Sequence, residues 1–416
     1  MEKVYILGGA QTDFERNWTK EGKNVFAMLR EVTETAFQQT DIPFEVVSEL
    51  NRENKVGLFV GNFLAEDFIK QSHLGGLLTE INKVFYGIPS VRCEAACASG
   101  SVAIDMGATK IRSGEFDLSI VVGFEMMKTV NAEQGSQYIG KAALYETEAK
   151  DIPFAFPGIF SQLGDIFIKK YNLDEQQYMD ALAYIANNNY ENAKRNPNAQ
   201  TRNWFMDLKQ AKSRGTATNP YIKGRIAKSD CSQITDGAVM IMLASERFVR
   251  KYGKERYPVI KGYAQRTAPF SFEKKIMESA GNEYVLPWTR KTVEEAYRKA
   301  GMNVKDIDFF ETHDCFTPSE YAAISAFGIT APGQEYQAIL DGTVLWGGKK
   351  PINPSGGLIG CGHPIGGTGV RMMLDLYKQV TGNASTYQVE GARNGMMLNL
   401  GGTATTNFAF IVGVEN

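Results

Sequence analysis

The segment Glu94-Ala95-Ala96-Cys97-Ala98-Ser99-Gly100 sets a cysteine among small residues, where an extended stretch gives way to a helix. Small neighbours let the backbone turn sharply and leave the sulfur free, and N–H groups at the turn can face a carbonyl oxygen. A cysteine at a helix start is favoured as a thiolate nucleophile. An ordinary buried cysteine is the alternative for a thiol taken alone. The context of Cys97 favours the nucleophile.

The regions on both sides of Cys97 alternate between apolar runs of strand length and helical patterns. Around it, strands are expected at 56–60 and 118–123, and helices at 24–40 and 99–112. The alternation returns with a strand at 237–244, and a second series then predicts strands at 307–311, 396–402 and 408–412 and a helix at 367–381. Such alternation indicates an α/β fold whose sheet is covered by helices on both faces. Each series leads to a cysteine or histidine motif, so we infer two structurally similar halves.

The middle of the chain has a different composition. Residues 126–225 are rich in tyrosine, asparagine, lysine and glutamine, and their helical patterns are broken by Asn196-Pro197-Asn198. We therefore predict a helical insertion that covers the substrate site as a lid. The predicted organisation has an N-terminal half made of 1–125 and 226–253, which carries Cys97, and a C-terminal half over 254–416.

Two of the three histidines in the chain, His313 and His363, lie in its C-terminal third. His363 belongs to Gly360-Cys361-Gly362-His363-Pro364, where glycine and proline hold the ring with little backbone freedom. A ring held in this way suits a general base. His313 and Cys315 are one residue apart on an extended segment, so their side chains are expected on the same side. A thiol beside an imidazole can titrate near neutrality and act as acid and base, although a structural polar pair stays open.

Two further positions, Ser232 and Gly401, fit either a ligand contact or an ordinary turn. Ser232 lies in a polar turn before an apolar strand. Gly401 follows another apolar strand, where a glycine lets backbone N–H groups approach a ligand closely.

The composition argues against several classes of protein. A net charge of −2 over 416 residues gives no signal for nucleic acid. No apolar run reaches the ~18 residues of a membrane span, and the N-terminus lacks the form of a signal peptide. Five cysteines without regular spacing predict no disulfide framework and a reducing, cytoplasmic location. Cys93 and Cys97 have no second cluster to complete a zinc site, so we expect no metal.

Taken in this order, the motifs resemble those of the thiolase superfamily, and within it the sterol-carrier-protein-type, acetyl-CoA acetyltransferase-like subgroup. The resemblance extends over nearly the whole chain, through segments 97–100, 188–198, 232–237, 313–316, 353–357 and 362–366. It implies a thiolase fold of two similar βαβαβαββ halves in a five-layered αβαβα arrangement with a helical loop insertion. It also implies acyl transfer between coenzyme A thioesters through an acyl-Cys97 intermediate.

The resemblance implies a role for each candidate by its position. Cys97 resembles the acylated nucleophile and His363 its activating base. The N–H groups of Cys97 and Gly401 resemble the oxyanion hole for the acyl carbonyl, and His313 with His363 resembles the hole for the thioester enolate. Ser232 resembles a contact with the pantetheine arm. Coenzyme A is implied as a substrate, with no tightly bound cofactor.

One position departs from the family pattern. Many thiolases place a second cysteine in a Cys-x-Gly motif near the C-terminus, where this chain has Asn399-Leu400-Gly401. In the sterol-carrier-type subgroup, the cysteine of a His-Asp-Cys-Phe motif resembles a replacement, so the acid/base role passes to Cys315.

Three activities stay open. The first is a thiolase that cleaves a 3-oxoacyl-CoA or runs the reverse Claisen condensation. The second is a condensing C-acyltransferase similar to HMG-CoA synthase, which would need a carboxylate base such as Glu125, Glu311 or Glu320. The third is a catalytically reduced acyl-CoA-binding subunit. The implied partners are acyl-CoA thioesters, further copies of the chain in a homodimer or tetramer, and a small zinc-ribbon/OB-fold subunit; neither nucleic acid nor a membrane is expected.

Overall fold

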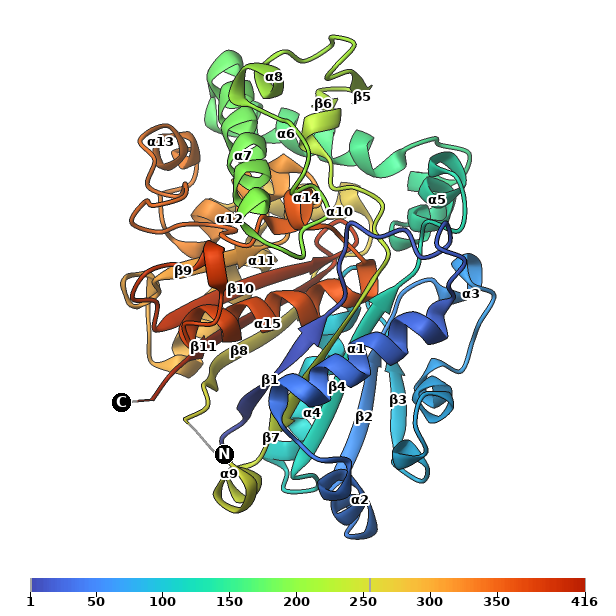
Figure 1. Cartoon of the computed structure of the whole chain (residues 1–416). Coiled ribbons are helices and arrows are strands. Elements are labelled where there is room, and N and C mark those ends of the chain that lie inside the picture. The colour runs from blue at the N-terminus through green and yellow to red at the C-terminus, as the bar shows by residue number, and fades with distance from the viewer. Residues whose placement is uncertain (1, 254–255, 416) are drawn as a thin grey trace.

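A computed structural model describes residues 2–253 and 256–415 of the chain (Figure 1). In these ranges, nine strands form one mixed sheet in the order β3-β2-β4-β7-β1-β8-β11-β10-β9. The N-terminal part of the chain supplies β1 (Tyr5–Gln11), β2 (Val56–Gly61), β3 (Ser90–Cys93), β4 (Leu118–Glu125) and β7 (Gly237–Ala244). The C-terminal part supplies β8 (Val259–Thr267), β9 (Phe309–Thr312), β10 (Asn394–Gly401) and β11 (Thr406–Gly413).

The two parts of the sheet have the same connectivity. From the middle outwards, the first part runs β1, β7, β4, β2, β3, and the second runs β8, β11, β10, β9. On the edge of β9 that faces away from β10, Phe310 forms a parallel bridge with Ile352. This bridge corresponds to β3, which pairs in parallel with β2 in the first part. The parts meet through the residue pair Tyr5 and Val259. This duplicated topology confirms the predicted pair of similar halves.

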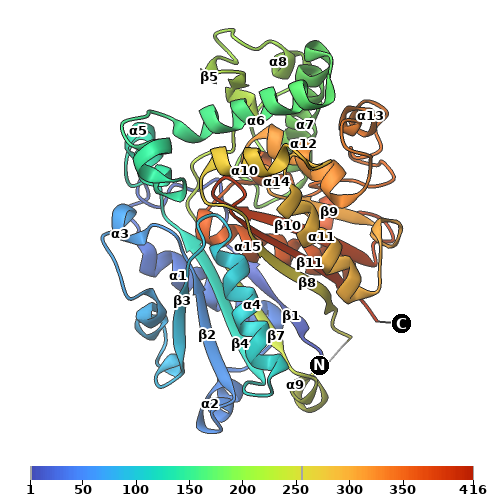
Figure 2. The same cartoon turned by 180° about the vertical axis from the view of Figure 1, so that it is seen from behind.

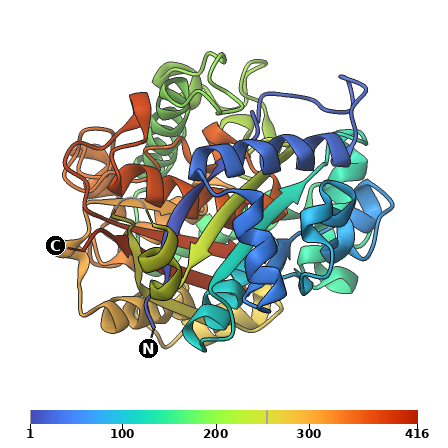
Figure 3. The same ribbon diagram turned by 60° about the horizontal axis from the view of Figure 1, so that its bottom comes forward.

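Helices divide the molecule into five layers. Helix α1 (Val25–Thr40) covers the outer face of the first part of the sheet, and α11 (Pro287–Ala300) covers the outer face of the second, as Figures 1 and 2 show from opposite sides. Helices α4 (Ser99–Arg112) and α15 (Thr368–Val380) pack against each other between the two parts. Figure 3 shows α1 lying across the strands.

Alternating side chains of the strands supply the apolar cores on both faces. In β7, Met240 and Met242 pack on the side of α1, whereas Val239 and Ile241 pack on the opposite side with α4 and α15. All eight residues of β7 are buried, which explains why its sequence is a continuous apolar run.

The two central helices begin against each other, and a glycine makes this close approach possible. A Cβ atom at Gly369, near the start of α15, would lie only 2.4 Å from the backbone nitrogen of Ser101 in α4. No larger residue fits there without movement of the backbone. The turn that carries Cys97 is therefore held directly against the segment that follows His363.

Residues 126–236 connect β4 to β7 and lie at the top of the view in Figure 1. They contain α5 (Ala132–Ile139), α6 (Ala155–Tyr171), α7 (Glu175–Arg195), α8 (Leu208–Lys212) and a hairpin of β5 (Tyr221–Lys223) and β6 (Ile226–Ala227). The predicted end of the insertion at 225 falls inside this hairpin, because Lys223 pairs with Ile226.

Shorter helices complete the chain: α2 (Phe44–Arg52), α3 (Ala65–Phe68), α9 (Glu246–Tyr252), α10 (Phe272–Ser279), α12 (Thr317–Phe327), α13 (Glu335–Leu340) and α14 (Gly357–Cys361). Within the described ranges, no helix combines the length and the apolar character needed to cross a bilayer.

Candidate active site

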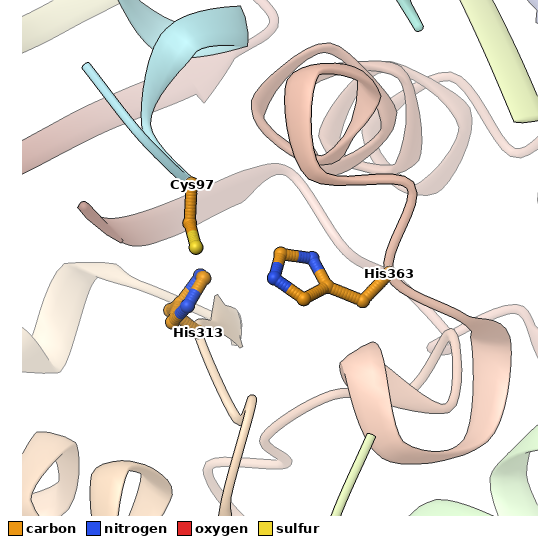
Figure 4. A group of neighbouring side chains, drawn as sticks. All are labelled: Cys97, His313 and His363. Carbon is orange, nitrogen blue, oxygen red and sulfur yellow. The ribbon is translucent and has the colours of Figure 1, made fainter. Parts of the chain in front are cut away.

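Three side chains that are far apart in the sequence meet beside the central helices (Figure 4). Cys97 comes from the turn before α4, His313 from the end of β9, and His363 from the loop before α15. The sulfur of Cys97 and a ring nitrogen of each histidine all lie within 4.8 Å of one another. The two rings are nearly perpendicular, at 84°, with centroids 5.2 Å apart. The structure thus brings together three of the residues that the sequence singles out.

A strained turn presents the sulfur of Cys97. Ala96 has a φ of 50°, in the left-handed region that alanine rarely adopts. The hydroxyl of Ser99 stabilises the turn, because it accepts from the N–H of Ala95 at 3.0 Å and donates to the carbonyl of Ala96 at 2.6 Å. The small residues of the motif are therefore required by the backbone path that places the thiol.

Hydrogen bonds fix both the ring and the backbone of His363. Its Nδ1 lies 2.7 Å from the hydroxyl of Thr368, and that hydroxyl donates to the carbonyl of Pro364 at 3.0 Å. Since a hydroxyl has a single proton, Nδ1–H is the donor to Thr368, and Nε2 carries no proton. The backbone N–H of His363 donates to Thr235 Oγ1 at 2.8 Å. Nε2 is therefore free to accept the proton of a thiol, as a general base must.

His313 is fully buried and is contacted from one side by Asn399. The Nδ1 atom of His313 lies 3.1 Å from the amide nitrogen of Asn399, which also donates to the carbonyl of Cys97 at 3.2 Å. The amide oxygen of Asn399 accepts from the hydroxyl of Ser101 at 2.7 Å. The Nε2 atom of His313 is buried and has no hydrogen-bond partner among the described residues.

Cys315 lies just before α12, and it lines the same cavity as Cys97. Its carbonyl accepts from the N–H of Ser232 at 2.9 Å, which joins two of the segments predicted to form the site. Asp314 instead accepts from two backbone N–H groups of α14, at 2.6 and 3.1 Å. The position of Cys315 in the cavity is compatible with an acid/base role, and that role stays a prediction.

Cys97, Cys315 and His363 line a cavity of about 400 Å³, whereas His313 is fully buried and is not among its lining residues. The inserted segment lines it with Met127, Ala132, Ser136, Ile139, Phe154, Phe156, Pro157 and Ile222. Ser232 and Lys228 are among the polar residues of the wall. No carboxylate of the described chain lines this cavity. The insertion is polar on average, but it presents mainly apolar side chains to the site.

Burial keeps the reactive groups uncharged in the ligand-free protein. It raises the pKa of the Cys97 thiol to about 12, against a smaller opposing effect of the N–H of Gly402. It lowers the pKa of His363 to about 3, and together with the neighbouring His363 it lowers the pKa of His313 well below the ordinary value. Burial also raises the pKa of the Cys315 thiol well above its ordinary range.

These pKa shifts correct two expectations from the sequence. The start of α4 and the nearby imidazoles do not keep Cys97 as a thiolate at rest, because burial raises the pKa of the thiol more than the backbone N–H groups beside it lower that pKa. For the same reason Cys315 does not titrate near neutrality, since its pKa is raised. A thiolate of Cys97 then forms only as its proton passes to an acceptor such as His363.

The rate of acylation of Cys97 should not fall when the pH is lowered from about 8 to about 6, where an ordinary histidine becomes protonated. Because the pKa of His363 is lowered to about 3, the ring keeps its unprotonated Nε2 over this range. Rapid-quench measurement of acyl transfer from an acyl-CoA gives the profile. A fall with a midpoint near the ordinary histidine pKa of ~6.5 would contradict this assignment of the base.

The N–H of Gly402, one residue after the predicted Gly401, forms a hydrogen bond with the Cys97 thiol. Gly402 has a φ of 62° and lines the cavity. Gly401 ends β10, where a Cβ atom would lie 2.3 Å from the carbonyl oxygen of Ala95. The role of the Gly401 N–H in an oxyanion hole stays a prediction.

The carboxylates considered as catalytic bases are engaged elsewhere. Glu125 accepts hydrogen bonds from three backbone N–H groups. Glu311 binds Arg371, and Glu320 accepts from the amides of two buried asparagines. All three are buried, and they tie together the loops around the site instead of facing the cavity.

The sequence motifs do not reveal the residues that hold the catalytic loops. Buried asparagines on or just after α7 hydrogen-bond to the 352–355 segment or to carboxylates beside it: Asn188, Asn189, Asn192 and Asn196. Several asparagines close together in a predicted helix could have indicated these residues, because asparagine is unfavourable in helix interiors. Thr235 and Thr368, which hold His363, carry no comparable signal.

Cys97, His313 and His363 are also the one group, within residues 2–253 and 256–415, that could hold a metal ion. Thiolate and imidazole are ligands that zinc prefers. Cys93 takes no part in this group. The expectation of no metal site stays a prediction.

Known proteins share the sequence pattern of this chain. The pattern of the family "Thiolase, N-terminal domain" matches residues 4–207, and that of "Thiolase C-terminal domain-like" matches residues 274–414. The acetyl-CoA acetyltransferase of Methanothermobacter thermautotrophicus is 30% identical over 98% of this chain and 98% of that protein. Sterol carrier protein 2 of Oryctolagus cuniculus is 28% identical over 96% of this chain and 70% of that protein.

Solved structures share the fold. The Ltp2-ChsH2(DUF35) aldolase has a TM-score of 0.74 at 18% identity, covering 99% of this chain and 98% of that chain. Human mitochondrial 3-ketoacyl-CoA thiolase in complex with CoA has a TM-score of 0.68 at 17% identity, covering 100% and 98%. The sequence patterns and the full-length relative together show that the chain belongs to the thiolase family.

Proposed function

We propose that the protein is a thiolase-type acyl-CoA C-acyltransferase, which cleaves a 3-oxoacyl-CoA with coenzyme A, or runs the reverse condensation, through acyl-Cys97. The observation that supports this best is the convergence of the Cys97 sulfur with ring nitrogens of His363 and His313 beside an apolar cavity. The set supplies a nucleophile, a base and a group that faces a developing oxyanion. A covalent route for acyl transfer requires these three.

In the first half-reaction, the sulfur of Cys97 attacks the 3-oxo carbon while Nε2 of His363 accepts its proton. The N–H groups of Cys97 and Gly401 stabilise the resulting oxyanion. The bond between the α and β carbons then breaks, and the departing thioester leaves as an enolate whose oxygen is held by His313 and His363. The thiol of Cys315 protonates its α carbon, which releases acetyl-CoA or another acyl-CoA, while the shortened acyl group stays on Cys97.

In the second half-reaction, coenzyme A enters and gives its thiol proton to the Cys315 thiolate. Its sulfur attacks the acyl group on Cys97, and the Cys97 sulfur leaves with the proton held by His363. Ser232, which lines the cavity, is placed to contact the pantetheine arm. The apolar walls that surround the sulfur suit an apolar acyl group.

The two alternative activities have less support. A condensing enzyme similar to HMG-CoA synthase would use a carboxylate base in the pocket, and Glu125, Glu311 and Glu320 are all directed into loop contacts. A catalytically reduced acyl-CoA-binding subunit would not require a complete set of nucleophile, base and oxyanion group.

We also propose that further chains complete the enzyme. Strand β3 forms a free edge of the sheet, and Val91 on it is 42% exposed. An uncovered edge offers backbone groups for pairing with another chain, which supports a homodimer or a tetramer built from dimers. The aldolase with the same fold is described with two components, Ltp2 and ChsH2(DUF35). A small partner subunit is therefore proposed here as well.

The proposal is tested with a panel of 3-oxoacyl-CoA substrates carrying short, branched and aromatic acyl groups, with and without co-purified partners. We expect thiolysis of at least one substrate and an acyl mass on the peptide that contains Cys97. An acylated Cys97 without cleavage of any substrate would instead support the reduced subunit. A protein that neither cleaves nor becomes acylated would contradict the proposed function.

A further inference from the structure

Asn399 lies on β10, between the turn that carries Cys97 and the ring of His313. Its side chain is fully buried, and both polar atoms of its amide have partners. It occupies the place of the second cysteine of many thiolases, but an amide cannot act as acid or base at neutral pH. Its contacts assign it another task.

The neighbours of Asn399 fix the direction of its amide. The carbonyl oxygen of Cys97 can only accept, so the atom 3.2 Å from it is the amide nitrogen. The amide oxygen then faces the hydroxyl of Ser101, 2.7 Å away, which can donate. A reversed amide would set two oxygens against each other. The amide nitrogen therefore also faces Nδ1 of His313, at 3.1 Å, and is the donor there.

A ring nitrogen that accepts a hydrogen bond carries no proton, so the single proton of a neutral His313 ring is on Nε2. Burial and the neighbouring His363 keep the ring neutral, because they lower the pKa of His313 well below its ordinary value. Nε2 of His313 is buried and has no partner among the described residues. His363 has the opposite arrangement, with its proton on Nδ1 towards Thr368 and a bare Nε2.

We propose that Asn399 is a positioning residue that holds His313 as the Nε2–H tautomer, so that the site contains one N–H donor beside one bare ring nitrogen. The opposite tautomers separate two tasks. His363 takes the proton of Cys97, and His313 donates a hydrogen bond to the oxygen of the thioester enolate. The identity of that oxygen rests on the proposed function, whereas the tautomer does not.

Nuclear magnetic resonance of protein labelled with nitrogen-15 in its histidines distinguishes protonated from bare ring nitrogens. The chain has three histidines, so few signals appear. Those of His313 are assigned by their loss in His313→Gln. We expect a protonated Nε2 and a bare Nδ1 for His313 in the wild-type protein. A protonated Nδ1 would overturn the proposal.

Asn399→Asp keeps the shape of the side chain but replaces the donor by an acceptor. At alkaline pH, where the new carboxyl group is ionised, the proton of His313 should move to Nδ1. Cleavage of the carbon–carbon bond should then fall roughly 10²-fold, the usual effect of losing one oxyanion donor. Transfer of an acyl group from Cys97 to coenzyme A does not use the His313 donor, so the loss there, which comes only from the missing hydrogen bond to the Cys97 carbonyl, should be much smaller than the loss of cleavage.

The matched control is Asn394→Asp, the same change at the outer end of β10. It should alter neither the His313 signals nor either rate. A bare Nδ1 in Asn399→Asp, or an undiminished cleavage rate after the proton has moved, would overturn the proposal. If Asn399→Asp does not fold, the wild-type spectrum still decides the tautomer. If the wild-type protein cleaves no 3-oxoacyl-CoA, the proposed function fails, while the nitrogen signals still test the role of Asn399.

Discussion

Cys97→Ala should abolish both thiolysis and condensation while the protein stays folded. The sulfur of Cys97 is the atom proposed to attack the substrate, and it is the sulfur that lies within 4.8 Å of a ring nitrogen of both His313 and His363. Removal of a catalytic nucleophile from an enzyme with a covalent mechanism costs roughly 10⁶-fold in kcat. The substitution removes one buried atom, so its effect on the free energy of unfolding should be on the order of 1 kcal/mol.

Steady-state assays in both directions measure the loss, and intact-mass analysis after incubation with an acyl-CoA shows whether any acyl group remains bound. The matched control is Cys93→Ala, which changes another buried cysteine at the end of β3. It should keep both the activity and the acyl mass. Turnover by Cys97→Ala at the wild-type rate would refute the assignment of the nucleophile.

Cys315→Ala should separate the two halves of the reaction. The variant should still accept an acyl group on Cys97, because His363 and the thiol of Cys97 are unchanged. It should fail to make or break the carbon–carbon bond, because the proton for the α carbon comes from the Cys315 thiol. Loss of a general acid or base typically costs ~10²–10⁴-fold.

Mass spectrometry of acyl-Cys97 measures the first step in this variant, and the assay with a 3-oxoacyl-CoA measures the second. Cys315→Ser provides a second variant of nearly the same volume, in which a hydroxyl replaces the thiol, and it should show the same split. A carbon–carbon rate in Cys315→Ala close to that of the wild type would show that another group, such as His313, handles the proton.

The sequence predicts most of the elements around the site. Helix α4 spans Ser99–Arg112 and β7 spans Gly237–Ala244, as their patterns indicate. Both have strong local signals, because an apolar run or a helical period persists over their whole length. The bridge at Ile352 has no such signal, since it is one residue pair whose existence depends on β9 beside it.

The sequence predicts the residues of the site that lie in recognisable motifs. Cys97, His313 and His363 are found because unusual local sequences surround them, and the structure brings their reactive atoms together. The pKa of Cys97 could not be predicted, because it is set by residues from distant segments that exclude water from the thiol. The direction of the Asn399 amide depends in the same way on contacts with α4 and β9.

The burial of Cys97 has a consequence for its survival under oxidative stress. Peroxides oxidise cysteine to sulfenic acid according to its thiolate character and its exposure. In the ligand-free protein, the side chain is 6% exposed, and burial raises the pKa of the thiol to about 12. The sulfur is therefore protonated and shielded whenever substrate is absent. We therefore expect peroxide to oxidise Cys97 more slowly in the ligand-free protein than it oxidises an exposed cysteine of ordinary pKa.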